Sequence, residues 1–292
     1  MSTHDSRRPK ARMGRLLLRF TVLCLLGLLV AAPFVWMVGA SFKTHAEVER
    51  GGAHIVPERL TLENYPKLLG QIPVRGDEYL DLDFGRWYVN SFFIALATTL
   101  LTVLTSAMAA YAFSRLRWKG RDTVFLLYLA TMMVPGVVTM IPNFQIMVWF
   151  GFVNTYHGLI IPAAFSAFGT FLLRQFMLSI PPSLDEAARI DGASHWRIFW
   201  DVVMPLARPG VIALAIITFL AAYQSFFWPL IMLNDSQYFP LSVGLLELDT
   251  GYGVQAELVM AAATLTVIPL IVIFVIFQKF LVRGLQLGGV KG

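Results

Sequence analysis

Long apolar runs recur along the chain, and the shorter connections between them carry nearly all of its charged residues. A helix that crosses a bilayer needs roughly 20 mainly apolar residues, within a usual range of about 17 to 25. Six runs meet this requirement, and they predict an all-α integral membrane protein with six transmembrane helices. The predicted spans are Leu16–Ala40, Phe92–Phe113, Val124–Met140, Leu159–Leu178, Gly210–Met232 and Leu258–Val282.

Among the prolines within these runs, Pro135 interrupts the third run and Pro229 interrupts the fifth. Proline lacks a backbone N–H and disturbs the helix before it, so a kink is expected at each position. Kinks are tolerated in membrane helices when neighbouring helices satisfy the freed backbone groups. We interpret both prolines as structural.

The first apolar run follows a basic start, a combination that also occurs in cleavable signal peptides. The run is too long for a signal-peptide core, and Phe34, Trp36 and Met37 stand where small residues would mark a cleavage site. We therefore expect the run to be retained as the first transmembrane helix.

Composition agrees with a membrane protein. Apolar residues make up 57% of the 292 residues and charged residues only 14%, which is too little charge to cover a soluble fold of this size. The single cysteine, Cys24, excludes an internal disulfide and lies within an apolar run, where we expect it to pack inertly.

The charged residues set the orientation of the spans. Basic residues exceed acidic ones in the N-terminal segment, in the connection between spans two and three, and in the C-terminal tail. Acidic residues exceed basic ones in the first and last loops of the opposite side. Because cytoplasmic segments are enriched in lysine and arginine, both termini are predicted to be cytoplasmic.

The connection between the fourth and fifth runs has a pattern of its own. Ser183 and Glu186 have the spacing of a capping box, which predicts the start of a short helix after Pro181-Pro182. Gly192 then suits the left-handed residue that ends such a helix.

A second short helix is predicted to begin at Ser194, with aromatic and aliphatic residues at helical spacing until Pro205. Helices this short are marginal without packing. Either a partner docks on the pair, or the pair is a connector that lies flat on the membrane, and the pattern alone leaves both open.

At this point the sequence resembles a known family. The segment EAARIDGASHWRIFWDVVMPLARP is similar to the EAA loop of importer permeases of the ATP-binding-cassette class. The segments FLLRQF, IPNFQIMVWFGFVNTYHGLIIP and LTLENY, together with Asn90-Ser91, resemble the family's spans and first outer loop. The ending FLVRGLQLGGVKG resembles the carbohydrate branch, specifically the second permease of a heterodimeric pair as in maltose importers. The resemblance covers about four-fifths of the chain.

The resemblance implies a bacterial inner-membrane (cytoplasmic-membrane), multi-pass subunit with a defined layout. Residues 1–15 form a basic cytoplasmic segment, 16–40 the first span and 41–88 a periplasmic loop. Residues 89–282 form the core permease domain, with the EAA loop at 181–209 and a second periplasmic loop at 233–257. Residues 283–292 form a cytoplasmic tail.

Carried over residue by residue, the resemblance assigns a coupling element that contacts a separate ATPase subunit. This element contains Glu186, Ala187, Ala188, Asp191, Gly192 and Ala193. The family's tail also runs toward the ATPase, which makes Gly284, Lys291 and Gly292 candidate contacts. The outer-loop glycines Gly244, Gly251 and Gly253 are candidate contacts for a periplasmic solute-binding protein.

The chain departs from the family where sugar permeases often carry Trp-Asn-Asp, because Tyr223-Gln224-Ser225 stands there. Aromatic faces stack on sugar rings while amides and hydroxyls bind sugar hydroxyls. Tyr223, Gln224, Phe227 and Trp228 are therefore candidate pathway-lining residues, although ordinary helix packing explains each of them as well.

The expected assembly contains this chain, a second homologous permease, two ATPase subunits, the binding protein, lipid and a sugar, with no nucleic acid. ATP and magnesium would be bound by the ATPase subunits, because the chain has no phosphate-binding glycine motif. No cluster of residues suggests a metal site or an enzyme.

The alternative is an ion-coupled secondary carrier or channel, which would need charged groups within the membrane that the apolar runs lack. The sugar itself stays open among maltose-like, glycerol-phosphate-like and acidic (uronate) oligosaccharide substrates.

Overall fold

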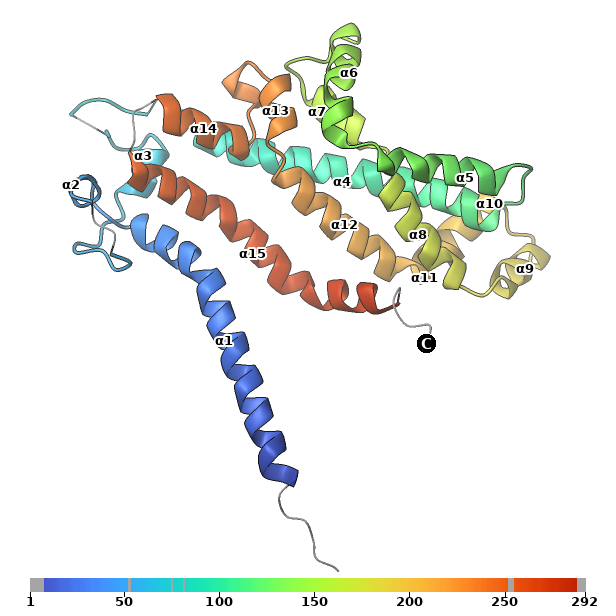
Figure 1. The fold of residues 1–292 in the computed structure, drawn as a ribbon. Helices are drawn as coiled ribbons and strands as arrows, with labels where there is room; N and C mark the ends of the chain where they lie inside the picture. Colours follow the sequence, from blue (N-terminus) through green and yellow to red (C-terminus); the bar gives the residue numbers. More distant parts are fainter. Residues whose placement is uncertain (1–7, 52–53, 75, 81, 252–254, 288–292) are drawn as a thin grey trace, which may run out of the picture. The chain divides into compact units, whose positions relative to one another are not determined.

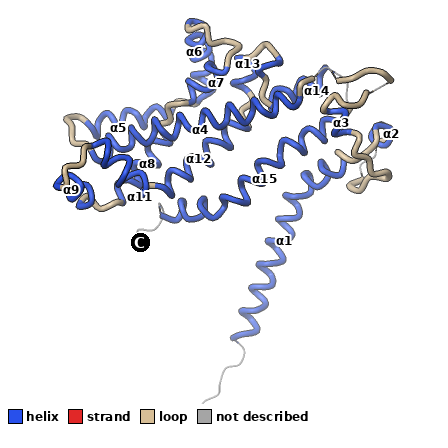
Figure 2. The backbone as a smooth tube through the Cα atoms, turned by 180° about the vertical axis from the view of Figure 1, so that it is seen from behind, coloured by secondary structure: helices blue, strands red, loops and turns tan. Residues whose placement is uncertain are grey.

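The computed structural model describes residues 8–51, 54–74, 76–80, 82–251 and 255–287. Throughout this part of the chain the regular structure is helical, as predicted, and no strand is present (Figure 2). The helical elements are α1 (Arg8–Ala40), α2 (His45–Glu49), α3 (Asn64–Leu68), α4 (Phe84–Arg115), α5 (Arg121–Ala130), η1 (Thr131–Met133), α6 (Gly136–Trp149), α7 (Tyr156–Ala163), α8 (Ala167–Ser179), α9 (Ser183–Ile190), α10 (His195–Arg197), η2 (Ile198–Val203), α11 (Met204–Leu206), α12 (Arg208–Tyr223), α13 (Phe227–Met232), η3 (Ser236–Tyr238), α14 (Leu241–Gly251) and α15 (Ala256–Leu287).

Three single helices within the described residues are long and apolar enough to cross a membrane: Leu16–Ala40, Phe84–Arg115 and Ala256–Gln278. In three further cases, two consecutive helices are together long and apolar enough to cross a membrane, but the chain bends at a short break between them. The pairs are Arg121–Met133 with Gly136–Trp149, Tyr156–Ala163 with Ala167–Ser179, and His195–Leu206 with Arg208–Tyr223, and their bends are 101°, 43° and 78°. Six spans result if each bent pair counts as one.

The chain divides into two compact units. One contains residues 1–81 and 249–265, and the other contains residues 82–248 and 266–292. In the first unit, α1 exposes apolar side chains around most of its circumference, as expected of a helix that faces lipid. In the same unit His45 on α2 contacts Glu257 at the start of α15, with 2.8 Å between Nδ1 and Oε1.

The second unit is built around α4, which packs along both α8 and α12, and these two helices also contact each other (Figure 1). Small residues allow the close approach. A Cβ on Gly169 of α8 would lie 2.5 Å from Oγ of Ser106 on α4 and 3.1 Å from a methyl of Leu214 on α12. A core of Ala107, Ala110, Leu173, Met177, Phe199 and Leu214 fills the contact.

The third predicted span differs from a single helix, because the chain bends sharply at Pro135. Val134 before this proline is extended, with φ −82° and ψ 118°, as the proline ring requires of its preceding residue. The helix α6 then runs to Trp149 and projects from the α4–α8–α12 bundle (Figure 1).

The fifth predicted span is divided between α12 and α13, but the break lies at residues 224–226 and not at Pro229. Pro229 stands in the first turn of α13, where the N–H that proline lacks would have no helical partner anyway. The expectation that Pro229 interrupts the helix was therefore wrong.

Candidate functional site

The helix α9 begins differently from the capping box that the sequence suggested. Pro182 is the N-cap residue, with helical φ and ψ, and neither Ser183 nor Glu186 caps the helix. The first-turn amides of Leu184, Asp185 and Glu186 donate to the carbonyls of Pro181 and Pro182. Because the two prolines fix φ near helical values, the turn starts one residue early and the predicted capping box is wrong.

The end of α9 is as predicted. Gly192 has φ +81°, the left-handed conformation that glycine adopts at little cost. Its amide donates to the Arg189 carbonyl at 3.0 Å, and the amide of Ala193 donates to the Ala188 carbonyl at 2.9 Å. These two bonds form a Schellman motif, which satisfies carbonyls at the helix end.

Most of α9 faces outward. Glu186, Ala187, Arg189, Ile190 and Asp191 are exposed, and Ile190 exposes 86% of its surface. The carboxylate of Glu186 makes no hydrogen bond or ion pair with the described residues. Only Asp185 is buried, while Ala188 and Ala193 pack partly against the core. The predicted coupling residues thus include an exposed stripe without an intramolecular partner.

The second short helix is anchored in the bundle. Ser194 caps it by accepting a hydrogen bond from the amide of Arg197 at 3.3 Å, which confirms the predicted start. The helix passes through a π-helical segment in which Ile198, Phe199 and Val203 are buried. The Phe199 ring meets the Tyr111 ring of α4 at 5.3 Å, edge to face.

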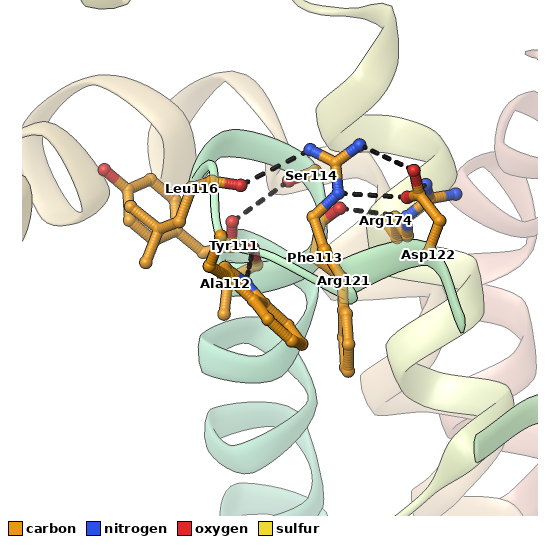
Figure 3. Close-up of polar contacts among 9 residues, drawn as sticks. Tyr111, Ala112, Phe113, Ser114, Leu116, Arg121, Asp122 and Arg174 are labelled. Carbon is orange, nitrogen blue, oxygen red and sulfur yellow. Dashed lines mark hydrogen bonds and ion pairs between the residues drawn. The ribbon is translucent and has the colours of Figure 1, made fainter. Parts of the chain in front are cut away.

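A polar network fixes the α4–α5 turn at the same end of the bundle (Figure 3). Arg121 donates to the Leu116 carbonyl and to Asp122, with 3.0 Å between its Nε and Oδ1. Arg174 of α8 donates to the Phe113 carbonyl at 3.2 Å and lies over the Phe125 ring, 4.2 Å from its centre. The network ties α4, α5 and α8 together.

The candidate pathway residues fall into two groups. Tyr223 is 3% exposed, contacts the rings of Phe92 and Phe219, and donates to the Thr266 carbonyl. Its contacts are those of a packing residue. Gln224 and Phe227 are exposed, and the half-buried Trp228 donates from Nε1 to the Gly158 carbonyl at 2.9 Å.

A cavity of about 270 Å³ lies where α4, α6 and α7 meet the α12–α13 break. Its lining residues are Ile94, Thr98, Asn143, Leu159, Pro162, Ala163, Ala222, Ser225, Trp228 and Pro229. Thr98, Asn143 and Ser225 have no side-chain partner among the described residues, so their polar groups are available to a ligand. No charged residue lines the cavity.

Of these lining residues, Trp228 was predicted from the sequence, whereas the polar Thr98, Asn143 and Ser225 were not. Ser225 belonged to the Tyr-Gln-Ser segment where the chain departs from the family, which was a usable signal. Thr98 is one of several threonines in the second apolar run, and Asn143 lies just after the third. Nothing in their spacing marks either residue as part of a binding site.

The outer-loop glycines have different surroundings. Gly244 lies on α14, a helix of 11 residues within the predicted loop, and a Cβ there would be 2.2 Å from the Trp87 ring. This contact gives Gly244 a role in packing. Gly251 ends α14, and Gly253 lies outside the described residues. Burial raises the pKa of Glu247 on the same helix.

The tail candidates are only partly described. Gly284 lies within α15, while Lys291 and Gly292 lie outside the described residues. Among those residues no group of three or more His, Cys, Asp or Glu side chains is placed to hold a metal ion.

The apolar helices, their bent pairs and the two-helix turn at one end of the bundle define an integral membrane protein. The chain belongs to the family of binding-protein-dependent transport system inner membrane components, whose family model matches residues 102–287.

Two named permease proteins are similar to this chain over most of its length. The arabinooligosaccharides transport system permease protein AraQ of Halalkalibacterium halodurans is 34% identical over 262 residues, covering 89% of this chain and 91% of the relative. The sn-glycerol-3-phosphate transport system permease protein UgpE of Brucella abortus is 32% identical over 268 residues, covering 90% and 94%.

A solved structure shares the fold. It is a chain of a bacterial ABC transporter involved in the import of the acidic polysaccharide alginate. The superposition has a TM-score of 0.82 at 25% sequence identity and covers 95% of this chain and 99% of the other.

Proposed function

We propose that the chain is one of two permease subunits of an ATP-binding-cassette importer for a neutral oligosaccharide. The observation that carries this proposal is α9, an exposed two-turn helix with unpartnered Glu186 and Asp191, held at the end of the bundle by the core. A short helix is stable only with packing, and the exposed stripe provides the surface for a partner. Family membership and AraQ support the assignment.

In this proposal the ATPase subunit docks on α9 through Glu186, Ala187, Ala188, Asp191, Gly192 and Ala193, with Gly284, Lys291 and Gly292 as secondary contacts. Ala187 is exposed and small, which allows close approach. The chain crosses the inner membrane six times with both termini in the cytoplasm, so the loops around α2, α3 and α14 face the periplasm. A second permease and a solute-binding protein complete the pathway, and Gly251 and Gly253 contact the binding protein.

The cavity at the α12–α13 break suggests the substrate class. Its free hydroxyls and amide suit sugar hydroxyls, and the Trp228 ring suits a sugar face. A phosphate or carboxylate substrate would be expected to meet a cation, and none lines the cavity. Among the substrates left open by the sequence, a neutral oligosaccharide such as that of AraQ therefore fits better than glycerol phosphate or a uronate.

Reconstituted proteoliposomes containing both permeases, the ATPase and the binding protein test the proposal. We expect uptake of a labelled neutral oligosaccharide that requires internal ATP and is blocked by vanadate. Uptake driven by an ion gradient without ATP would contradict the proposal and favour a secondary carrier.

The docking surface has its own variant in the same assay. Ala187→Trp adds bulk to an exposed residue, so the chain itself should fold normally, and a docking loss of about 1.4 kcal/mol would lower ATPase retention tenfold. Ala187→Ser preserves the size and is the matched control. Equal retention by the two variants would remove α9 from the docking surface.

A further inference from the structure

The helix α9 is attached to its own bundle by very few side chains. Its only buried residue is Asp185, at 6% exposure, and its other inward contact is the small Ala188. The large apolar side chains of Leu184 and Ile190 are exposed and cannot anchor it. The position of α9 therefore depends strongly on the partner of Asp185.

That partner is Arg115, the last residue of α4. Its Nη1 lies 3.5 Å from Oδ2 of Asp185, and the two side chains are only 5% and 9% exposed. Its Nη2 donates to the carbonyls of Met177 and Ile180 at 2.6 and 2.9 Å. These carbonyls belong to the C-terminal end of α8, and the Met177 carbonyl also accepts from the amide of Ile180. One guanidinium thus joins α4, α8 and α9.

The pair is not arranged for maximal stability. Nε of Arg115 and Oδ1 of Asp185 are both buried without a hydrogen-bond partner, and the carboxylate receives a single long contact in place of a bidentate one. Buried ion pairs often stabilise a fold no more than apolar residues of similar size would. The rigid, planar guanidinium instead fixes the orientation of α9 relative to α8, because its N–H donors hold fixed angles to one another.

One helical turn earlier on α4, Tyr111 holds the other short helix. Its hydroxyl donates to the His195 carbonyl at 3.1 Å. Residues four apart share one face of a helix, so the face of α4 that carries Tyr111 and Arg115 contacts both short helices of the loop.

We propose that Arg115 is a positioning residue that sets the placement of α9 through Asp185 and transmits the displacement of α9 to α4 and α8. This role rests on the proposed docking of an ATPase on α9. Arg115 itself does not touch ATP, substrate or the partner; it acts through the coupling helix.

Asp185→Asn isolates the link, because it removes the charge on α9 and leaves the bonds from Arg115 to α8 in place. The measurement is the number of ATP molecules hydrolysed per sugar transported by the reconstituted importer. We expect this ratio to rise at least about fivefold, the lower end of energetic coupling between linked sites, while the ATPase remains bound. Asp185→Glu, which keeps the charge, should restore the ratio to near the wild-type value.

Asp201→Asn is the matched control, because Asp201 lies in the same loop and pairs with Arg197 at 3.4 Å on the exposed surface. Exposed pairs contribute little, so its ratio should equal that of wild type. A wild-type ratio in Asp185→Asn would overturn the proposal. Absence of ATP-driven uptake in wild type would instead overturn the proposed function.

If Asp185→Asn fails to assemble, Arg115→Lys decides the question. Lysine keeps the charge but lacks the fork that reaches α8 and α9 together. A raised ratio in Arg115→Lys supports the positioning role, and an unchanged ratio contradicts it.

Discussion

Gly192 shows how a single residue determines the geometry of the candidate docking site. Its φ of +81° turns the chain between α9 and the second short helix, and an added Cβ would have no atom within 4 Å. Side chains would therefore fit in the available space, and the backbone conformation alone demands glycine. The sequence could predict this residue because a glycine after a short helix is a local signal that needs no tertiary contact.

Gly192→Val should raise the free energy of this turn by about 1–2 kcal/mol, the cost of left-handed conformation for an L-residue, and more for a β-branched one. We expect ATP hydrolysis to persist while oligosaccharide uptake falls by roughly 5- to 30-fold, the population change that this energy produces. Gly136→Val is the control, since Gly136 also has open space around its Cβ position but no positive φ. Similar uptake by the two variants would contradict the coupling role of the bend.

Other residues could not be predicted because their roles depend on tertiary contacts. Ser183 and Glu186 have the spacing of a capping box, yet Ser183 is already the first helical residue and Pro182 is the N-cap. The hydroxyl of Thr98 and the amide of Asn143 come together with Ser225 only through the packing of α4, α6 and the α12–α13 break. The spacing of residues along the sequence cannot reveal which of them line one cavity in the fold.

At the scale of elements, the helix breaks are stabilised by hydroxyl groups from neighbouring helices. Thr102 of α4 donates to the Ala163 carbonyl at 2.9 Å, and Thr105 donates to the Ala164 carbonyl, where α7 ends. Ser242 of α14 donates to the Ser225 carbonyl at 2.6 Å. Carbonyls freed at a break in an apolar environment need such partners, so the breaks are built into the fold.

The existence of the long apolar helices was predictable from the sequence, and the breaks were only partly so. Pro135 marks the first bend correctly, whereas the break at residues 224–226 has no proline or glycine within it. The helix α14 lies in the connection 233–257, where the apolar pattern predicted no helix. Its Gly244 makes room for Trp87, which sequence spacing alone does not show.

Gly244→Ala tests this packing between α14 and α4. The new Cβ would lie 2.2 Å from Cε3 of Trp87, a ring that is 1% exposed and whose Nε1 donates to the Ser236 carbonyl. Overpacking of this kind costs about 1–3 kcal/mol, so the thermal unfolding midpoint of the purified importer should fall.

Gly85→Ala is the control for this substitution, because its Cβ would meet only Asp83 at an ordinary 3.8 Å. Equal midpoints for the two variants would show that the Trp87 ring does not confine Gly244.

In the second unit, α4 connects the segment around η3 and α14 at its start with the short helices α9 and α10 at its end. Near its start, Asn90 donates to the carbonyls of Gln237 and Phe239, and Ser91 accepts from the amide of Leu241. At its end, Tyr111 and Arg115 contact the two short helices between α8 and α12. A helix of 32 residues spans about 48 Å at 1.5 Å per residue, enough to reach across a bilayer.

The proposed function requires that these two ends of α4 lie on opposite sides of the membrane, with α9 on the side where ATP is hydrolysed. Single cysteines at exposed positions test it directly: Lys119→Cys beside the end of α4 and Asn234→Cys before η3, each combined with Cys24→Ser. We expect an impermeant thiol reagent, added outside intact cells stripped of their outer membrane, to label Asn234→Cys and spare Lys119→Cys. Inverted membrane vesicles should give the opposite pattern. Labelling of both cysteines from the same side would contradict the placement of the two ends of α4 on opposite sides of the membrane.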